Sequence, residues 1–277
     1  MLKQRVITAL VLLVILAGSI MISPIAFAGV MTFCVGAALW EWLRMLKVKG
    51  ALALAAAVAA ALFAAWFAGL RLPREALLAL TGLDCAVWAA ITVGLIRSRE
   101  TGYRVANPIQ AAFAFLMLPL AWYSLMWLFE LGSWTMVVSV LVIVWVADIC
   151  AYFCGRAFGK HRMAPAISPK KTWEGAAGAY VCGIIAAAAL ACAFAGRADL
   201  YQPLVFETAG TAGALAIIVF LTLFSMMGDL LESAAKRQAG IKDSSNLLPG
   251  HGGFFDRLDA CIPVMPTAVF LLLLAGF

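Results

Sequence analysis

The sequence predicts an all-α, polytopic integral membrane protein with about nine transmembrane helices and a cytoplasmic N-terminus. Of its 277 residues, 65% are hydrophobic and only 12% are charged, and the mean hydropathy is +1.01. Apolar stretches of roughly 20 residues, the length that crosses a hydrocarbon core of ~30 Å, recur along the whole chain. We therefore expect residues 1–277 to form a single membrane domain.

The spanning segments can be read in order along the chain. The first follows Lys3 and Arg5, and its apolar run is longer than the ~7–15 residues of a signal peptide, so we expect it to be retained. The third is rich in alanine, which is ordinary helix-packing material. The fourth and sixth contain Asp84 and Asp148. The nine segments cover about residues 6–23, 25–43, 51–69, 76–96, 108–129, 134–154, 176–195, 210–228 and 260–277.

The basic residues set the orientation. With nine crossings and the N-terminus inside, only Arg71, Arg74 and Arg197 of the 20 Lys and Arg residues lie outside. This asymmetry agrees with the positive-inside rule. The net charge of +6 is then a property of a membrane surface with anionic lipids, and nucleic-acid binding is not expected.

The seven cysteines are scattered in or beside the predicted spans without CxxC spacing, and we interpret them as small buried residues. Both histidines and half of the 14 acidic residues lie in or beside two cytoplasmic loops of the second half. We therefore expect residues 1–130 to be scaffold helices and residues 134–277 to supply the catalytic helices and cytoplasmic loops.

The eighth span leaves the membrane as GDLLESAAKR, residues 228–237. Its polar residues Asp229, Glu232, Ser233 and Lys236 have the i, i+3, i+4, i+7 spacing of one helix face. That face can line a cavity, although a solvated helix end with local ion pairs has the same pattern.

A glycine-rich loop and a predicted helix start follow. Gly250, Gly252 and Gly253 flank His251, and such glycines allow the backbone to approach a phosphate closely. Asp256 and Asp259 have i, i+3 spacing, where carboxylates can provide hard oxygen ligands for a cation. A plain turn with a capped helix start would account for the glycines and for one aspartate. It would leave the other polar residues of segment 233–259 unexplained: Lys236, Arg237, Lys242 and His251.

A second polar loop follows the sixth span. Asp148 lies within that span, and an ionisable residue there indicates function. Ser168, Lys170, Lys171 and Thr172 then offer cations and hydroxyls at a helix start, a suitable anion site. There are plainer alternatives. Ser168 or Thr172 could simply cap the following helix, and Lys170 and Lys171 could simply fix the orientation of the chain in the membrane.

Together these loops provide carboxylates for a divalent cation and many cations for phosphates. This combination is typical of phosphoryl or nucleotidyl transfer to a lipid. A GxSxG elbow, a Walker A sequence and a Rossmann GxGxxG are all absent from the sequence.

The segment S-x-x-KR-x4-KD-x-S-x-x-L-P-x-HGG-F-x-DR-L-D at residues 233–259 resembles the signature of the bacterial phosphatidate cytidylyltransferases, the CDP-diacylglycerol synthases. The AYFCGRAFGKH segment after Asp148 and the SPKKTWEG segment from Ser168 are also similar to stretches of that family. Ala235 departs from the larger aliphatic residue that many members have there.

The resemblance implies that CTP and phosphatidic acid react to give CDP-diacylglycerol and pyrophosphate. It implies a metal centre with Mg²⁺, and K⁺ beside it, held at the positions of Asp229 and Asp256. It places the active site on the cytoplasmic face of the bacterial inner membrane and suggests a homodimer.

Within that reaction, we assign the other polar residues by their charge. Lys236, Arg237, Lys242 and Arg257 are expected to hold phosphates, with Lys170 and Lys171 at the triphosphate or the lipid phosphate. Asp243 and His251 are expected to orient the nucleotide or the metal surroundings, and Asp148 to tune the metal site or sense the lipid headgroup. Ser168, Thr172, Ser233, Gly252 and Gly253 complete the expected substrate-binding set.

Two alternatives remain open at this stage. A CTP-dependent kinase of a polyprenol or similar lipid alcohol could use a related metal site, but it would need a base and would release CDP. A transporter is supported only by the many spans and by Asp84 and Asp148, and the sequence shows no inverted repeat.

Overall fold

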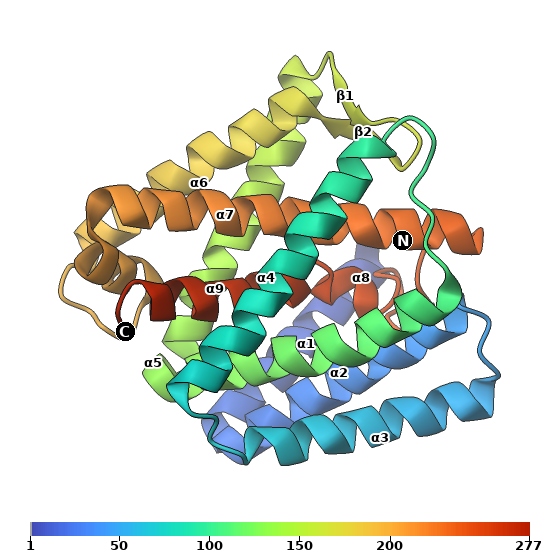
Figure 1. The fold of residues 1–277 in the computed structure, drawn as a ribbon, viewed down its shortest axis with the longest axis horizontal. Helices are drawn as coiled ribbons and strands as arrows, with labels where there is room; N and C mark the ends of the chain where they lie inside the picture. The colour runs from blue at the N-terminus through green and yellow to red at the C-terminus, as the bar shows by residue number, and fades with distance from the viewer. Residues whose placement is uncertain (1) are drawn as a thin grey trace.

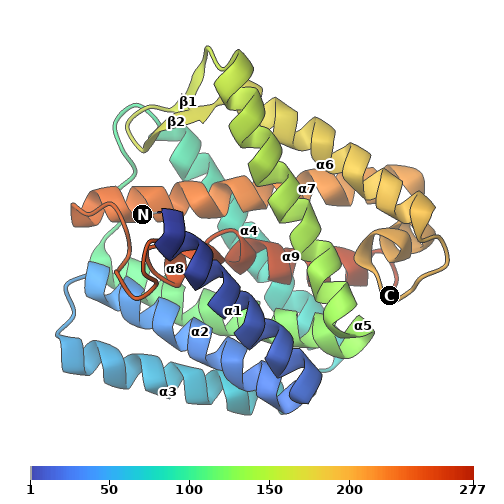
Figure 2. The same cartoon turned by 180° about the vertical axis from the view of Figure 1, so that it is seen from behind.

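A computed structural model describes residues 2–277 and confirms an all-α membrane protein (Figures 1 and 2). The side chains of Lys3 and Arg5, expected at the cytoplasmic surface, lie outside this description. The long helices are α1 (Leu2–Ile22), α2 (Pro24–Met45), α3 (Gly50–Ala68), α4 (Arg74–Arg97), α5 (Asn107–Phe158), α6 (Trp173–Ala193), α7 (Tyr201–Ala239) and α9 (Cys261–Leu274). A short helix, α8 (Phe255–Leu258), precedes α9.

Seven helical segments of the described chain are long and apolar enough to cross a membrane, the last of them running through α8 and α9 as Phe255–Leu274, and the apolar part of α1, Val6–Ile22, is shorter. The predicted fifth and sixth spans are one helix by hydrogen bonding, α5, which is interrupted at Gly132 and Ser133. Ser133 has φ 65°, outside the helical range, so the two halves of α5 are distinct segments. The number of crossings and the side of the N-terminus stay predictions.

Helix boundaries follow local chemistry. Ser23 caps α2 by accepting the N–H of Ala26 at 3.1 Å, and Pro24 suits the first helical position, where its missing N–H costs nothing. Helix α7 begins at Tyr201, nine residues before the predicted span. Gly210, with φ 67°, kinks the helix at the predicted start but does not end it. Gly240, with φ 76°, ends α7 in the left-handed conformation.

A small hairpin was not expected from the sequence. Strands β1 (Arg162–Ala164) and β2 (Ser168–Thr172) pair antiparallel and project from the end of α5 next to the start of α6 (Figure 1). The strands are only 3 and 5 residues long, too short for an alternating pattern to reveal them. The hairpin places the Ser168–Thr172 segment beside α5 and α7.

Helices α7 and α9 lie at the centre of the molecule, where α9 packs against α4, α5 and α7, and α6 packs against α5 at the edge (Figures 1 and 2). Helices in a membrane associate through close van der Waals packing, which small residues permit. A methyl group at Gly178 of α6 would collide with Cys154 of α5, so glycine is required there. Large apolar side chains such as Leu62 and Trp66 are exposed on α3, where lipid would cover them.

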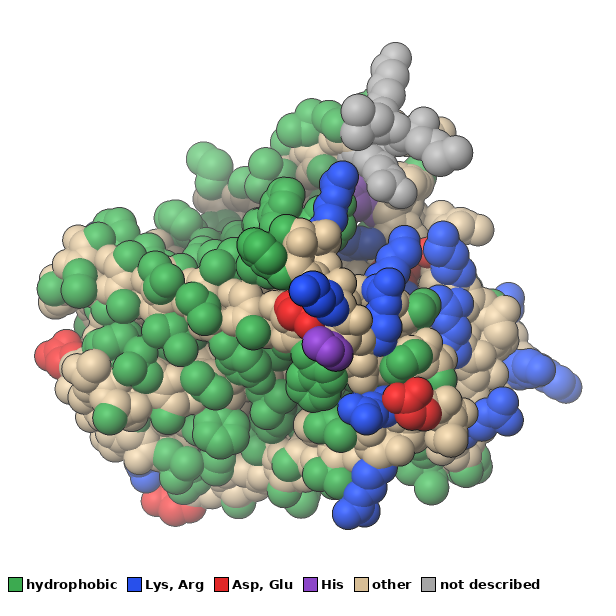
Figure 3. All heavy atoms as spheres, turned by 90° about the horizontal axis from the view of Figure 1, so that it is seen from above, with side chains coloured by type: hydrophobic (Ala, Val, Ile, Leu, Met, Phe, Trp, Pro, Cys, Tyr) green, Lys and Arg blue, Asp and Glu red, His purple; other side chains and the backbone are tan. Residues whose placement is uncertain are grey.

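Most of the basic side chains visible in Figure 3 lie on one side of the molecule. Figure 3 shows Lys and Arg gathered over one end, while hydrophobic side chains cover the other end of the visible face. The glycine-rich loop between α7 and α8 packs beside the end of α2 (Figure 2). The division into a scaffold half and a catalytic half stays a prediction.

Candidate active site

Three carboxylates converge where α7 meets the start of α9. Oxygen atoms of Asp229, Glu232 and Asp259 all lie within 4.8 Å of one another. Glu232 is only 3% exposed, and its Oε1 has no hydrogen-bond partner among the described residues. Burying charges of like sign together is costly unless a cation compensates them. The oxygen donors and the unpaired Oε1 therefore fit a hard divalent cation.

The polar stripe predicted on α7 is present. The Ser233 hydroxyl donates to Oδ1 of Asp229 at 3.5 Å, and Lys236 pairs with Glu232 at 2.9 Å. Leu230 and Ala234 are buried on the apolar side of the helix. The local ion pair of the plainer alternative is therefore present, but Glu232 and Lys236 are mostly buried, so this part of the stripe faces the interior.

Two lysines balance this negative charge. Lys171 from β2 lies 2.9 Å from Oδ2 of Asp229 and donates to the backbone oxygen of Met226 at 3.1 Å. Lys236 bridges Oε2 of Glu232 and Oδ1 of Asp256. Both side chains are mostly buried, so their charges are little screened by solvent.

Asp256 has a different environment from the one predicted. Its Oδ1 accepts from Lys236 at 2.8 Å. Its Oδ2 accepts from the backbone N–H groups of Gly253 and Ser244, at 2.8 and 3.0 Å, and from the Ser244 hydroxyl at 3.0 Å. Asp256 therefore organises the loop, while Asp259 joins Asp229 in the acidic cluster. A metal-ligand role for Asp256 stays a prediction.

A cavity of about 390 Å³ opens beside the acidic cluster. It combines polar and apolar walls, as a site for a lipid phosphate requires. The hydroxyl of Thr172 accepts the Gly175 N–H at 3.1 Å, so this residue does cap α6 while it lines the cavity. The predicted site residues in the wall are Asp148, Ser168, Lys170, Lys171, Thr172 and Asp229.

The remaining charged residues predicted for the site lie in and around the loop and are exposed. Arg237, Lys242 and Asp243 make no side-chain hydrogen bond or ion pair with any other described residue. Arg257 donates to the backbone oxygen of His251 at 2.9 Å, and this contact closes the turn around Gly252, which has φ 84°. Nδ1 of His251 is buried without a partner in the described part of the chain.

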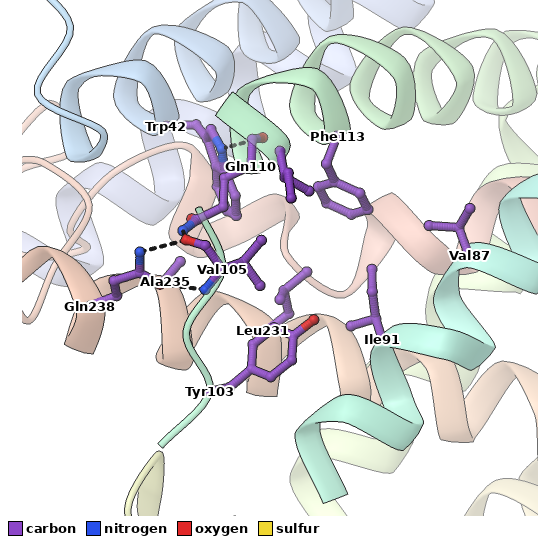
Figure 4. Close-up of a pocket in the computed structure, with 11 residues that line it drawn as sticks. Trp42, Val87, Ile91, Tyr103, Val105, Gln110, Phe113, Leu231, Ala235 and Gln238 are labelled. Atoms are coloured by element: carbon purple, nitrogen blue, oxygen red, sulfur yellow. Dashed lines mark hydrogen bonds between the residues drawn. The ribbon is translucent and has the colours of Figure 1, made fainter. Parts of the chain in front are cut away.

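A second cavity, of about 140 Å³, lies on the apolar side of α7 (Figure 4). Leu231 and Ala235 face it, and its polar groups are engaged, since Gln238 exchanges two hydrogen bonds with the backbone of Val105 at 2.7 and 3.0 Å. No charged side chain lines it. It suits an apolar group and not a triphosphate, whereas the cavity beside the acidic cluster is lined by Asp229, Lys170 and Lys171.

Three acidic residues were not assigned to the site from the sequence. Glu232 and Asp259 were singled out by their spacing only, and Glu41, which accepts the N–H groups of Phe254 and Phe255, was not considered. The spacing signal existed for two of them, since Glu232 follows Asp229 by three positions and Asp259 follows Asp256 by three. Glu41 offered a different signal, because it is the one acidic residue in the predicted second span.

Comparisons with known proteins identify the family of the chain. A model of the Cytidylyltransferase family matches residues 3–275. The chain is 39% identical to a phosphatidate cytidylyltransferase of Pseudomonas aeruginosa, over 100% of this chain and 99% of that protein. It is 32% identical to one of Haemophilus influenzae, with 96% of each chain covered. Another, from Bacillus subtilis, is 44% identical over 50% of this chain and 48% of its own length. The chain therefore belongs to the cytidylyltransferase family.

Proposed function

We propose that the protein transfers the cytidylyl group of CTP to phosphatidic acid, giving CDP-diacylglycerol and pyrophosphate. The observation that carries this proposal is the acidic cluster with its two lysines, which opens beside a cavity of mixed polarity. The relatives that match over nearly their full length are named phosphatidate cytidylyltransferases, which supports the same reaction.

In this reaction a phosphate oxygen of phosphatidic acid attacks the α-phosphorus of CTP. The new P–O bond forms as the bond to the bridging oxygen of the β-phosphate breaks, and pyrophosphate leaves with the electron pair. A phosphate monoester is already anionic near neutral pH, so the reaction needs no strong general base. This agrees with a site rich in lysine and carboxylate.

We infer that the cluster of Asp229, Glu232 and Asp259 holds Mg²⁺, with K⁺ as a neighbouring ion. Bound there, the metal would neutralise charge on the phosphate oxygens. Lys171 and Lys236 fix the carboxylates in place. Lys170 lines the cavity, where it can hold an incoming phosphate.

The exposed cations Arg237, Lys242 and Arg257 are available to bind the CTP triphosphate. Asp148, which lines the polar cavity with Lys171, can limit how closely a phosphate approaches Asp229. We place the site at the cytoplasmic face of the bacterial inner membrane, because Lys and Arg gather at one end of the molecule (Figure 3). A homodimer stays a prediction from the family.

Product analysis with the purified protein tests the proposal. Incubation with CTP, Mg²⁺ and phosphatidic acid in detergent micelles should release one pyrophosphate for each CDP-diacylglycerol formed. Release of CDP from a polyprenol substrate would instead indicate a lipid-alcohol kinase. Turnover in micelles, where no gradient exists, would rule out transport as the main role.

A further inference from the structure

Glu41 is a fully buried carboxylate in the half of the chain that the sequence assigned to scaffold. Its exposure is 0%, and its neighbours on α2 include Leu39, Trp42 and Leu43, which are also buried. An ionised carboxylate is very costly to bury unless it is hydrogen-bonded or paired. The structure supplies hydrogen bonds, and all of them come from the glycine-rich loop and the start of α8.

Three donors, together with a Ser244 hydroxyl whose single proton is shared with Asp256, converge on this carboxylate. Oε1 accepts from the Ser245 hydroxyl at 2.5 Å and from the Phe254 N–H at 3.1 Å. Oε2 accepts from the Phe255 N–H at 2.7 Å and from the Ser244 hydroxyl at 3.1 Å. Backbone N–H groups can only donate, so an acceptor-only carboxylate suits this position and an amide does not.

Glu41 and Asp256 act on the same loop from two sides. The Ser244 hydroxyl lies 3.1 Å from Glu41 and 3.0 Å from Asp256. Gly253 donates its N–H to Asp256, while the next two N–H groups of the chain go to Glu41. A side chain at Gly253 would collide with Glu41 and with Ser244, so only glycine permits this approach.

Aromatic contacts hold α2 against the same segment. The rings of Trp42 and Phe255 are 4.8 Å apart, and Phe33 meets Phe254 edge-on at 5.6 Å. Trp42 also donates its indole N–H to the backbone oxygen of Gln110 at 3.0 Å, which fixes the end of α2 to α5 (Figure 4). Glu41 is therefore presented from a rigid support.

We propose that Glu41 is a positioning residue, which anchors the loop of residues 244–255 to α2 and thereby holds Asp256 against Lys236 on α7. This inference rests on the proposed function for its effect on catalysis. Its effect on the loop is independent of which reaction the site performs.

The test compares Glu41→Gln and Glu41→Asp with a control, Leu39→Ala, which creates a defect on the same buried helix without removing a hydrogen bond to the loop. In Glu41→Gln, we expect the amides of Phe254 and Phe255 to exchange with deuterium about tenfold faster or more, because each loses its charged acceptor. Leu39→Ala should leave those amides protected. Equal exchange in Glu41→Gln and in the wild type would overturn the proposal.

Kinetics separate positioning from general stability. Glu41→Gln should lower kcat/KM for CTP by about 10–100-fold, the range typical of residues that orient a site indirectly. Glu41→Asp, which keeps the charge, should recover part of this loss, and Leu39→Ala should lower the melting temperature without changing KM. If Glu41→Gln and Leu39→Ala changed KM and melting temperature alike, the role would be structural only.

Ser245→Ala provides a milder variant that removes one donor and keeps the carboxylate. It should raise KM for CTP, and its effect should be smaller in the Glu41→Gln background than alone, since both changes remove the same contact. Fully additive effects would contradict the anchor. If the wild type made no CDP-diacylglycerol while the exchange results held, the proposed function would fail and the anchor would stand.

Discussion

At the scale of single residues, the site divides its carboxylates into two groups that share a lysine. Lys236 contacts Glu232 of the acidic cluster at 2.9 Å and Asp256 of the loop at 2.8 Å. Asp256 has three donors around its two oxygens and shares the Ser244 hydroxyl with Glu41, whereas Oε1 of Glu232 has no donor among the described residues. The two groups should therefore respond differently to mutation.

Substitutions in the acidic cluster should weaken the response to metal. We expect Asp229→Asn and Asp259→Asn to raise the Mg²⁺ concentration needed for half-maximal activity by about tenfold or more, since each removes an oxygen donor with its charge. Asp256→Asn should lower kcat with little change in the Mg²⁺ requirement. Activity measured against Mg²⁺ concentration checks this, and Mn²⁺ binding followed by electron paramagnetic resonance gives a readout without turnover.

The metal ligands predicted from the sequence are Asp229 and Asp256, and this assignment predicts a different response to Mg²⁺. If Asp256→Asn raised the Mg²⁺ requirement as much as Asp229→Asn, while Asp259→Asn left it unchanged, then Asp256 and not Asp259 would be the ligand.

At the scale of elements, the junction of α7 and α9 depends on one glycine. A methyl group at Gly228 would collide with the backbone oxygen of Asp259 and lie 3.0 Å from Cγ of Pro263. These contacts involve backbone and a ring, which cannot move aside easily. The close approach also brings Asp229 and Asp259 together.

Gly228→Ala should therefore destabilise the protein by about 1–3 kcal/mol, the usual cost of overpacking, and reduce activity. Gly29→Ala is the matched control, because a methyl group there meets no atom within 4 Å. Thermal unfolding of both variants in detergent checks this prediction. A Gly228→Ala protein as stable as Gly29→Ala would show that the two helices are not tightly packed.

The sequence predicted most of the helices because a membrane requires long apolar segments, and these are visible in composition. It predicted the polar stripe on α7 because helix periodicity alone brings Asp229, Glu232 and Lys236 to one face. It could not predict that Glu41 reaches the loop, since that contact joins residues 203–214 positions apart. It also could not show that Asp256 turns toward Lys236, which depends on the path of the loop.

At the scale of the whole molecule, polar chemistry is concentrated at one end. The opposite connection, between α6 and α7, has a local ion pair in which Arg197 donates to both oxygens of Asp199 at 2.6 Å. These hydrogen bonds hold the pKa of Asp199 at about 2, so it stays ionised at neutral pH. Such an exposed pair adds little stability and suggests no site there.

Topology fusions test the predicted orientation. With the N-terminus inside and nine crossings, alkaline phosphatase fused after Gly196 or after Phe277 should be active, because both positions lie outside the cytoplasm. A fusion after Gly102, in the loop between α4 and α5, should be inactive, while green fluorescent protein there should fluoresce. The reverse pattern would place the acidic cluster on the other side of the membrane.

The most direct test of the central claim follows the phosphorus atoms of CTP. Purified protein in micelles with phosphatidic acid and Mg²⁺ is given CTP labelled at either the α- or the γ-phosphorus, and a reaction without protein is the blank. Cytidylyl transfer predicts that the α-label enters the lipid and the γ-label leaves as pyrophosphate. Appearance of the γ-label in the lipid, with no α-label there, would contradict the proposed reaction.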